Sequence, residues 1–389
     1  MKKPTLPPPD AAGAEHCGKV MAHLHDRIRE SGPLRFDRFW DTVMFAPGLG
    51  YYVSGTSKFG AGGDFVTAPE LGPVFAQCMA TQLAEAMACA GPQILELGAG
   101  SGAFACDALH RLATLEALPE QYLILEPSAE LAERQRRTLA ARAPALAERV
   151  VWLTALPSEF SGVIFGNEVM DAIAPRRVQW TRGQWTELHV DRRGEGLAWV
   201  GAPLPEELAQ AVASIEENWS ETPPEPYRTE IQTALAPWFS GLAQSLARGA
   251  ILMVDYGYPR SEYYHAQRSD GTLICHYRHH AHADPFVYPG LTDLSVSVDF
   301  SRAADGARAA GMQPFGYTHQ TYFLAGAGLD EIVMAAQDLS KRERFRRLAE
   351  IKRLTLPNEM GDRFKVMAAS KNCDPRLSGF SLDNRLGWL

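Results

Sequence analysis

The chain has 389 residues, of which 46% are hydrophobic and 22% are charged, and its net charge is −8. This is the composition of a globular protein with enough apolar side chains for a large core or two. No apolar run approaches the ~20 residues that a membrane span needs. The acidic balance argues against a broad nucleic-acid-binding surface and permits basic substrates.

The N-terminal residues 1–12 are rich in proline, and we expect them to be disordered. They lack the apolar segment of a signal peptide and the arginine- and serine-rich pattern of a transit peptide, so we expect a cytoplasmic protein. The chain has no CxxC spacing, and several cysteines lie among apolar residues, which predicts free, buried thiols. The cysteines are Cys17, Cys78, Cys89, Cys106, Cys275 and Cys373.

Residues 13–62 are expected to form a helical and then glycine-rich N-terminal segment. Helices are predicted over residues 18–30, where Ser31-Gly32-Pro33 follows, and over residues 36–44. The glycine-rich stretch that comes next has no clear period.

A capping box is predicted at Thr67, because Glu70 follows it at the spacing that lets each side chain bond to the other's backbone N–H. From Leu71 to Ala86 apolar residues recur at helical spacing. The sequence therefore predicts a helix that begins after Thr67 and ends at Gly91.

From residue 93 onward, short apolar segments alternate with helical ones, which is typical of an α/β fold with a mostly parallel sheet. Strands are predicted over residues 94–97, 122–125, 150–153, 162–165 and 250–254, and helices over 102–115 and 129–142. We assign this core to residues 63–190 and 247–325. Residues 191–246 interrupt the alternation and are expected to be a helical insertion that borders the substrate cleft, and residues 326–389 are expected to be a C-terminal extension.

The first core strand, ILEL, leads into a glycine loop, GAGSG. Glycines let the backbone turn tightly and approach a ligand, and the following helix offers free N–H groups. Glu126 ends the next strand, where carboxylates accept hydrogen bonds from ribose hydroxyls. The pattern fits a dinucleotide or S-adenosylmethionine (SAM), or a tight turn without ligand. Glu96, two residues before Gly98, favours SAM because dinucleotide strands are normally apolar there.

The fourth core strand ends in GNEVMDA, residues 166–172, where an amide and two acids follow an apolar run. Glu168 and Asp171 lie three residues apart, which places them on one side of a helical turn. In one interpretation they hold a cationic substrate. In the other, Asn167 caps a short helix and Asp171 favours its positive N-terminus.

Several segments, taken in order from about residue 34 to residue 330, resemble the MidA family of SAM-dependent methyltransferases, which includes mitochondrial complex I assembly enzymes that modify an arginine. The segments are GYYVSGTSKFG, GGDFVTAPELG, ILELGAGSGAFACDAL, YLILEPSAELAERQ, GNEVMDA, VDYGY, YPGLTDLSVSVDF and THQTYFL. The resemblance implies a Rossmann-like, seven-stranded methyltransferase core with SAM bound at the loop after its first strand.

Position by position, the resemblance also implies roles for single residues. Three glycines, Gly98, Gly100 and Gly102, would face the methionine end of SAM. Glu126 would bind the ribose, and the segment that ends at Leu156 would border the adenine. The remaining cofactor-site residues implied by the family's blocks are Asp64, Phe65, Thr67 and Asn167. Asn167 and Glu168 would lie beside the reacting methyl group.

The chain departs from the family pattern where NE is usually followed by two bulky residues and by DALPV. Val169 and Met170 stand at the bulky positions, and the proline is displaced by one residue, with Ala174 in its former place. These differences fall where the acceptor is expected, so the resemblance does not specify the same substrate.

Methyl transfer from SAM needs no catalytic nucleophile, because the positively charged sulfur already activates the methyl group. The protein has to align the acceptor and exclude water. An arginine acceptor adds a demand, since carboxylates must localise the guanidinium charge away from the attacking nitrogen. Asn167, Glu168 and Asp171 are therefore the predicted catalytic residues.

Two further residues are predicted to contact the substrate. Tyr256 follows the fifth core strand, where strand ends border ligands; the alternative is a simple turn. His282 lies in HYRHHAHADP, whose spacing is not that of a known zinc motif, so we predict no metal site.

The predicted function is a SAM-dependent methyltransferase that acts on a protein side chain, with arginine as the candidate. A small-molecule methyltransferase and a catalytically inactive SAM-binding assembly factor are the alternatives, and a nicotinamide enzyme ranks behind them. The expected partner is a protein, with no nucleic acid and no membrane span. The pattern does not predict the acceptor's identity or the oligomeric state.

Overall fold

The computed structural model describes residues 6–53 and 67–389. The chain divides into two compact units. Unit 1 contains residues 1–65, 171–234 and 258–299, and unit 2 contains residues 66–170, 235–257 and 300–389. Asp64 and Phe65, which were predicted to line the cofactor site, lie outside the described residues. Within the described chain, no helix is both long and apolar enough to cross a membrane.

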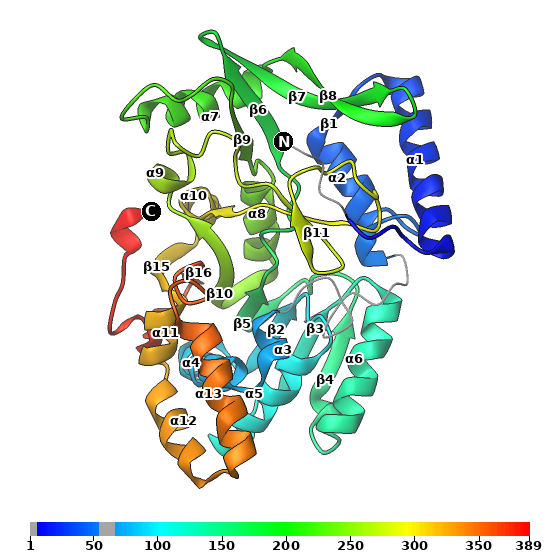
Figure 1. Ribbon diagram of the computed structural model, residues 1–389. Helices are drawn as coiled ribbons and strands as arrows, with labels where there is room; N and C mark the ends of the chain where they lie inside the picture. Colours follow the sequence, from blue (N-terminus) through cyan, green and yellow to red (C-terminus); the bar gives the residue numbers. More distant parts are fainter. Residues whose placement is uncertain (1–5, 54–66) are drawn as a thin grey trace. The chain divides into compact units, whose positions relative to one another are not determined.

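Unit 2 is an α/β unit whose elements are labelled in Figure 1. Its helices are α3 (Ala68–Leu71), α4 (Val74–Ala90), α5 (Ala103–Thr114), α6 (Ala129–Arg142), α8 (Leu235–Ser245), α10 (Phe300–Ala309), α11 (Gln320–Gly326), α12 (Leu329–Ala335) and α13 (Lys341–Thr355). Its strands are β2 (Gln93–Leu97), β3 (Gln121–Leu125), β4 (Val150–Leu153), β5 (Phe160–Asn167), β10 (Leu246–Tyr258), β15 (Gln313–His319) and β16 (Phe364–Lys371). The predicted core strands and helices are confirmed, with ends that shift by a few residues.

The strands of unit 2 pair in the order β15-β16-β10-β5-β2-β3-β4. The pairs from β10 to β4 are parallel, whereas β16 pairs antiparallel with both β10 and β15. This path contains seven strands, and the two-residue β14 (Val298–Asp299) pairs with β10 off the path, which makes eight strands in the described residues. The carboxyl ends of the parallel strands lie at one edge of the sheet, where ligands bind in open α/β folds.

The core of unit 2 joins the sheet to its helices through fully buried apolar residues on α4, α5 and the parallel strands. On α4 these residues recur at helical spacing. Val74 and Cys78 lie four residues apart, as do Phe75 and Met79. Phe104 of α5 stacks on Phe165 of β5, with ring centroids 4.3 Å apart. This packing sets the start of α5, and with it the glycine loop that precedes α5, against the end of β5.

The helix predicted after Thr67 is interrupted, because Gly72 and Pro73 separate α3 from α4. Thr67 stands at the predicted N-cap position of α3, but the side-chain bonding of a capping box is not formed. Thr67 makes no side-chain cap hydrogen bond, and the Glu70 carboxylate accepts a hydrogen bond from the Ser101 hydroxyl instead. A proline lacks the N–H that a continuous helix needs, so the capping spacing marks only the four-residue helix α3.

A residue far along the chain caps the start of α4. The Glu350 Oε1 atom on α13 accepts a hydrogen bond of 2.6 Å from the Val74 backbone N–H. The carboxylate occupies the space where a Cβ at Gly72 would stand, so glycine is required there. Burial raises the pKa of Glu350 to about 7. The C-terminal extension is thus built into the core of unit 2.

Residues 191–246 contain the two helices expected on either side of their proline cluster, α7 (Glu206–Glu217) and α8, but also the strands β8 (Gly196–Pro203) and β9 (Tyr227–Ile231), which were not predicted. Unit 1 as a whole combines helices with antiparallel strands. Its helices are α1 (Ala11–Ser31), α2 (Phe36–Phe45), α7 (Glu206–Glu217) and α9 (Arg260–Tyr263). Its strands are β1 (Leu34–Arg35), β6 (Arg176–Thr181), β7 (Gln184–Arg193), β8 (Gly196–Pro203), β9 (Tyr227–Ile231), β11 (Ile274–Tyr277), β12 (His280–His282), β13 (Asp293–Ser295) and β14 (Val298–Asp299). One sheet has the order β1-β7-β6-β9, with β8 on β7, and β12-β11-β13 is another.

The alternation of buried and half-buried residues in β7, with Leu188 and Val190 buried and His189 between them, explains why this segment forms a sheet. The unit begins its second segment at Asp171 rather than at residue 191. Helix α1 begins at Ala11, inside the tail that was expected to be disordered, and Asp10 caps it by accepting from the Gly13 N–H at 2.8 Å.

Candidate functional site

The predicted cofactor residues of unit 2 converge at the carboxyl edge of its sheet. Strand register places Leu97, the last residue of β2, beside Gly166 of β5. Asn167 of β5 in turn lies beside Val254 of β10. The glycine loop after β2 and the residues Asn167 and Glu168 at the end of β5 are therefore neighbours. This is expected for adjacent parallel strands, whose carboxyl ends lie at the same edge of the sheet.

The glycine loop has a backbone that side chains would strain. Gly98, Gly100 and Gly102 have φ angles of 64°, 52° and 82°, in the left-handed region that favours glycine. A Cβ at Gly98 would lie 3.4 Å from a Val169 methyl group. The loop closes on itself through a 2.8 Å hydrogen bond from the Gly102 N–H to the Ala99 carbonyl. The residue that follows, Ala103, begins α5.

Glu96 lies in the strand beneath the loop and is only 3% exposed. Its Oε2 atom accepts a hydrogen bond of 2.7 Å from the Tyr122 hydroxyl. Burial raises the pKa of Glu96 to about 8, and the nearby Glu126 adds to the rise. At neutral pH this carboxyl is therefore mostly protonated, and its hydrogen bond joins β2 to β3 two residues before Gly98.

Glu126, the predicted ribose ligand, stands at the end of β3. The Ser128 N–H donates to its Oε1 at 2.9 Å, and the Gln135 side chain donates to its Oε2 at 3.0 Å. Its own N–H donates to the Leu153 carbonyl at 2.9 Å. Both carboxylate oxygens are thus held in fixed directions at the edge of the sheet, as a binding residue requires.

Gln135 on α6 is a site residue that sequence reasoning missed. Its side chain is fully buried and joins three parts of the edge. The amide Nε2 donates to the Gly100 carbonyl at 3.1 Å as well as to Glu126, and Oε1 accepts from the Trp152 indole at 3.0 Å. The available signal was a glutamine in the buried stripe of α6, between Ala132 and Leu139.

Asn167 and Glu168 form the tip of β5. The Asn167 amide donates to the Glu168 carboxylate at 3.0 Å, and the Glu168 N–H donates to the Val254 carbonyl at 2.9 Å. Glu168 has a φ of 53°, which costs a residue with a side chain about 1 kcal/mol or more. The buried Oδ1 of Asn167 has no hydrogen-bond partner among the described residues. No helix begins after Asn167, because residues 168–175 form bends and turns. The alternative in which Asn167 caps a helix is therefore wrong.

Asp255 fixes the chain on the other side of the strand tip. Its fully buried carboxylate accepts from the Met170 N–H and from the Tyr256 N–H, both at 2.9 Å. Tyr256 lies within β10, because the strand runs on to Tyr258, and the alternative of a turn at this position is wrong. Its ring contacts that of Phe364 edge-on, with centroids 5.6 Å apart.

Two further predicted cofactor residues stand in the segment before α3 and in the loop after β4. Thr67 is half-buried just before α3, and Leu156 is half-buried in the loop after β4. Their predicted roles stay predictions. Near Thr67, the bond between Ser101 and Glu70 ties the TAPE segment to the glycine loop.

Asp171 and His282, the other two predicted substrate residues, belong to unit 1. Asp171 is 7% exposed, and its carbonyl accepts from the Val296 N–H at 3.3 Å. Burial and the carboxylates of Asp293 and Asp171 raise the pKa of Tyr52, which hydrogen-bonds to Asp293. Segments that carry the family resemblance thus meet inside unit 1 at a phenol and two buried acids.

His282 is 8% exposed at the end of β12. Its Nδ1 accepts from the Asp284 N–H at 3.4 Å, and its buried Nε2 has no hydrogen-bond partner in the described chain. Burial lowers the pKa of His282, so the ring is neutral at pH 7. In the described ranges, no three His, Cys, Asp or Glu side chains are placed to hold a metal ion.

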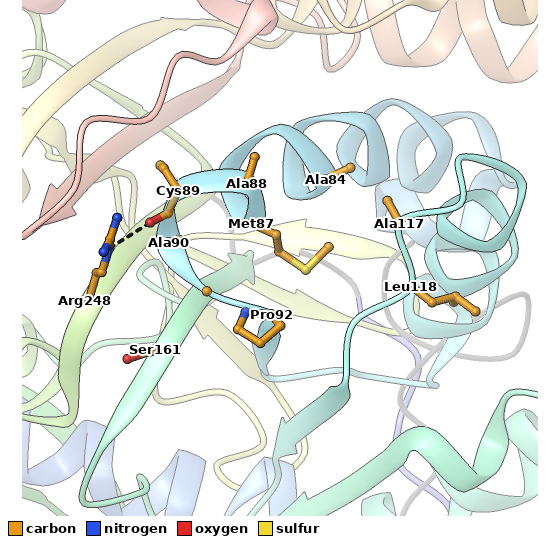
Figure 2. Close-up of a pocket in the computed structure, with 11 residues that line it drawn as sticks. Ala84, Met87, Ala88, Cys89, Ala90, Pro92, Ala117, Leu118, Ser161 and Arg248 are labelled. Carbon is orange, nitrogen blue, oxygen red and sulfur yellow. Dashed lines mark hydrogen bonds between the residues drawn. The ribbon is translucent and has the colours of Figure 1, made fainter.

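Figure 2 shows a pocket of about 600 Å³ at the opposite edge of the unit 2 sheet. It lies where β2 and β5 begin, and Ser161 and Pro92 line it. Most of its lining is apolar, and its cation, Arg248, donates to the Cys89 carbonyl at 2.8 Å. Because ligands of open α/β sheets bind at the carboxyl ends of the strands, this pocket is not the candidate cofactor site.

The residues at the carboxyl edge fit SAM. The glycine loop leaves space that a Cβ at Gly98 would fill, and Glu126 offers oriented carboxylate oxygens. The unpaired Asn167 oxygen is an acceptor suited to a cationic group. An open parallel sheet with such a loop after β2 and such an acid after β3 defines a Rossmann-like, nucleotide-binding enzyme of the methyltransferase class.

Comparison with known proteins places the chain within this class. It belongs to the family described as "Putative S-adenosyl-L-methionine-dependent methyltransferase", whose profile matches residues 74–318. The protein is a SAM-dependent methyltransferase, and the resemblance to the MidA family is confirmed.

A solved structure and two curated relatives illustrate the similarity. A "likely methyl transferase" from Burkholderia thailandensis, bound to S-adenosyl-homocysteine, is 39% identical; the match covers 99% of this chain and 100% of that chain with a TM-score of 0.93. The Caenorhabditis elegans protein arginine methyltransferase NDUFAF7 homolog, mitochondrial, is 26% identical over 99% of this chain and 93% of its own length. The Homo sapiens protein arginine methyltransferase NDUFAF7, mitochondrial, is 27% identical over 90% of this chain and 82% of its own length.

Proposed function

We propose that the protein transfers a methyl group from SAM to a guanidinium nitrogen of an arginine side chain in a protein substrate. The observation that carries the proposal is the strand tip of β5, where Asn167 and Glu168 stand beside the glycine loop in a strained backbone. Two relatives, from Caenorhabditis elegans and Homo sapiens, are named as protein arginine methyltransferases, which supports arginine as the acceptor.

When bound, SAM supplies an activated methyl group on a positively charged sulfur. Gly98, Gly100 and Gly102 would allow its methionine end to approach the backbone, and Glu126 would accept from its ribose hydroxyls. Gln135 keeps Glu126 and the Gly100 carbonyl in place while this occurs.

Glu168 is the group that recognises the acceptor in this proposal. A carboxylate that accepts from two guanidinium N–H groups localises positive charge on them and leaves the third nitrogen better able to attack. The Asn167 amide, bonded to Glu168 at 3.0 Å, fixes the direction of the carboxylate. Asp171, Tyr256 and His282 remain candidates for further contacts with the acceptor.

Two measurements test the proposal in sequence. Isothermal titration of the pure protein with SAM should show binding that Glu126→Ala weakens about tenfold or more, as expected for a lost charged hydrogen-bond acceptor. Lysate from a deletion strain, incubated with methyl-labelled SAM and the protein, should then yield labelled arginine in the protein fraction, and Glu168→Gln should abolish the label.

The other outcomes identify the alternatives. Label found only in small molecules would make the protein a small-molecule methyltransferase. Binding of SAM without transfer to any fraction would favour an inactive assembly factor. A bacterial and cytoplasmic setting forms part of the proposal; the similar Burkholderia thailandensis protein supports the bacterial source, and fractionation of cells would test the location.

A further inference from the structure

Helix α13 exposes large apolar side chains that no other element of the described chain covers. Its inward face consists of Glu350 and Leu354, which are buried against the rest of unit 2. On its outward face Phe345 is 75% exposed and Leu348 is 40% exposed. Contact between these apolar side chains and water is unfavourable. Exposed apolar surface of this kind indicates a site of interaction with another molecule.

The helix is also strongly basic. It contains seven lysines and arginines and two acids, in a chain whose net charge is −8. Glu350 is buried, and the Ser340 hydroxyl holds Glu343 at the N-terminal cap. Arg347 turns inward, where it donates to the Gln77 side chain at 3.1 Å. The other six cations form no ion pair within the described chain; they are Lys341, Arg342, Arg344, Arg346, Lys352 and Arg353.

The cations flank the apolar residues on the helix surface. At about 100° per residue, Lys341, Arg342, Leu348 and Lys352 all lie within about 60° of Phe345 around the helix axis. We call these five residues the α13 outer face. Along the helix, its two apolar side chains lie between Lys341 and Arg342 towards the start and Lys352 towards the end.

Apolar exposure continues on the segments next to α13. Met334 of α12 is 58% exposed, Leu339 just before α13 is 37% exposed, and Leu356 just after it is 48% exposed. All three lie within a few residues of the helix ends or on the preceding helix. Exposed apolar side chains therefore stand close in sequence to both ends of α13 as well as on its outer face.

We propose that the α13 outer face docks the protein on an anionic phospholipid surface. A helix lying in the headgroup region buries phenylalanine and leucine among the acyl chains, while lysine and arginine on its flanks reach the phosphates. An anionic bilayer attracts each such cation, and it accepts a convex helix without a matching groove. An acidic protein would have to supply that groove, and a nucleic acid would leave Phe345 in water.

This inference goes beyond the proposed function and does not depend on it, because α13 takes no part in the cofactor site. Docking would leave the carboxyl edge of the unit 2 sheet unchanged. The experiment that tests docking therefore measures binding to lipid vesicles and not methyl transfer.

The experiment is co-sedimentation of the full-length protein with vesicles of phosphatidylglycerol and phosphatidylcholine in equal parts, and with vesicles of phosphatidylcholine alone. We expect binding to the mixed vesicles only, and a loss of binding as salt rises. The triple variant Lys341→Ala, Arg342→Ala, Lys352→Ala should bind about 100-fold more weakly, at about fivefold for each cation. Phe345→Ser with Leu348→Ser should also release the protein.

Control variants carry matched changes elsewhere on the surface. Leu382→Ser removes another exposed apolar side chain, 63% exposed, and Arg192→Ala with Arg193→Ala removes exposed cations of unit 1. Both should bind the mixed vesicles like the wild type, and circular dichroism should show that every variant is folded.

Four results would overturn the proposal. The first is no binding to the mixed vesicles at low salt, and the second is binding that the α13 variants leave unchanged. The third is a preference for polyglutamate or duplex DNA over the vesicles, which would assign the face to an acidic protein or to nucleic acid. The fourth is a dimer in sedimentation that Phe345→Ser dissociates, because a second copy would then cover the face.

Discussion

Substitutions at Glu168 separate the strain in its backbone from the chemistry of its side chain. The φ of 53° at this position favours glycine, and the side chain makes a half-buried hydrogen bond with Asn167. Glu168→Ala and Glu168→Gly both remove that bond, but only the glycine variant also relieves the backbone. The difference between the two variants therefore isolates the strain.

We expect Glu168→Gly to be more stable than Glu168→Ala by about 1 kcal/mol, because a left-handed backbone costs alanine about that much. Glu159 supplies the matched control, since it is exposed and its φ is not positive. There the order should reverse, with alanine more stable by about 0.5 kcal/mol, because glycine loses more conformational freedom on folding.

Urea unfolding followed by circular dichroism measures both differences, and methyl transfer is assayed on the same samples. Both Glu168 variants should lose transfer, although the glycine variant is the more stable of the two. An alanine variant as stable as the glycine variant would refute the strain. Transfer that persists in either variant would refute the role of the Glu168 carboxylate.

Three further predictions follow from buried polar groups. Gln135→Leu should weaken SAM binding about tenfold or more by releasing Glu126 and the loop, whereas kcat at saturating SAM should change little; equal losses of kcat and affinity would contradict a positioning role. The pKa of Glu96 is raised from its unfolded value of about 4.5 to about 8, so the stability due to its protonation is present below pH 4.5 and falls by up to about 1.4 kcal/mol per unit as pH rises toward 8. Glu96→Gln should flatten that part of a stability–pH curve, and an unchanged slope would argue against the raised pKa. Glu350→Ala should lower the free energy of unfolding by about 1–3 kcal/mol by leaving the buried Val74 N–H unpaired, whereas Glu350→Gln, which keeps an acceptor, should cost less; equal losses would exclude the cap.

The parallel core and much of the candidate site could be predicted because their signals are local. Each apolar strand is followed within a few residues by its glycine or acid, as in Gly98 after β2 and Glu126 after β3. Parallel pairing then brings the strand ends together without further information. The tip at Asn167 and Glu168 was placed by the same reasoning.

The remaining features depend on partners far along the chain or on competing local signals. Glu350 caps a helix 276 residues away, and no spacing in the sequence joins the two. Gln135 appeared as one polar residue in a helix, and its three partners became visible only when the loop, β3 and β4 were in place. In unit 1, β7 was not predicted as a strand, although the alternation of Leu188 and Val190 with the half-buried His189 between them was present in its sequence.

The chain leaves unit 2 for unit 1 directly after two of the strands that carry the site. The first crossing follows Met170, three residues beyond the end of β5, and the second follows Gly257 on β10. Two segments of unit 1 are therefore inserted in the chain near the ends of β5 and β10. Insertions at these points leave β2, the glycine loop and β3, which carry the predicted contacts with the methyl donor, uninterrupted. The departures at Val169 and Met170 lie at this junction, where one module ends and the other begins.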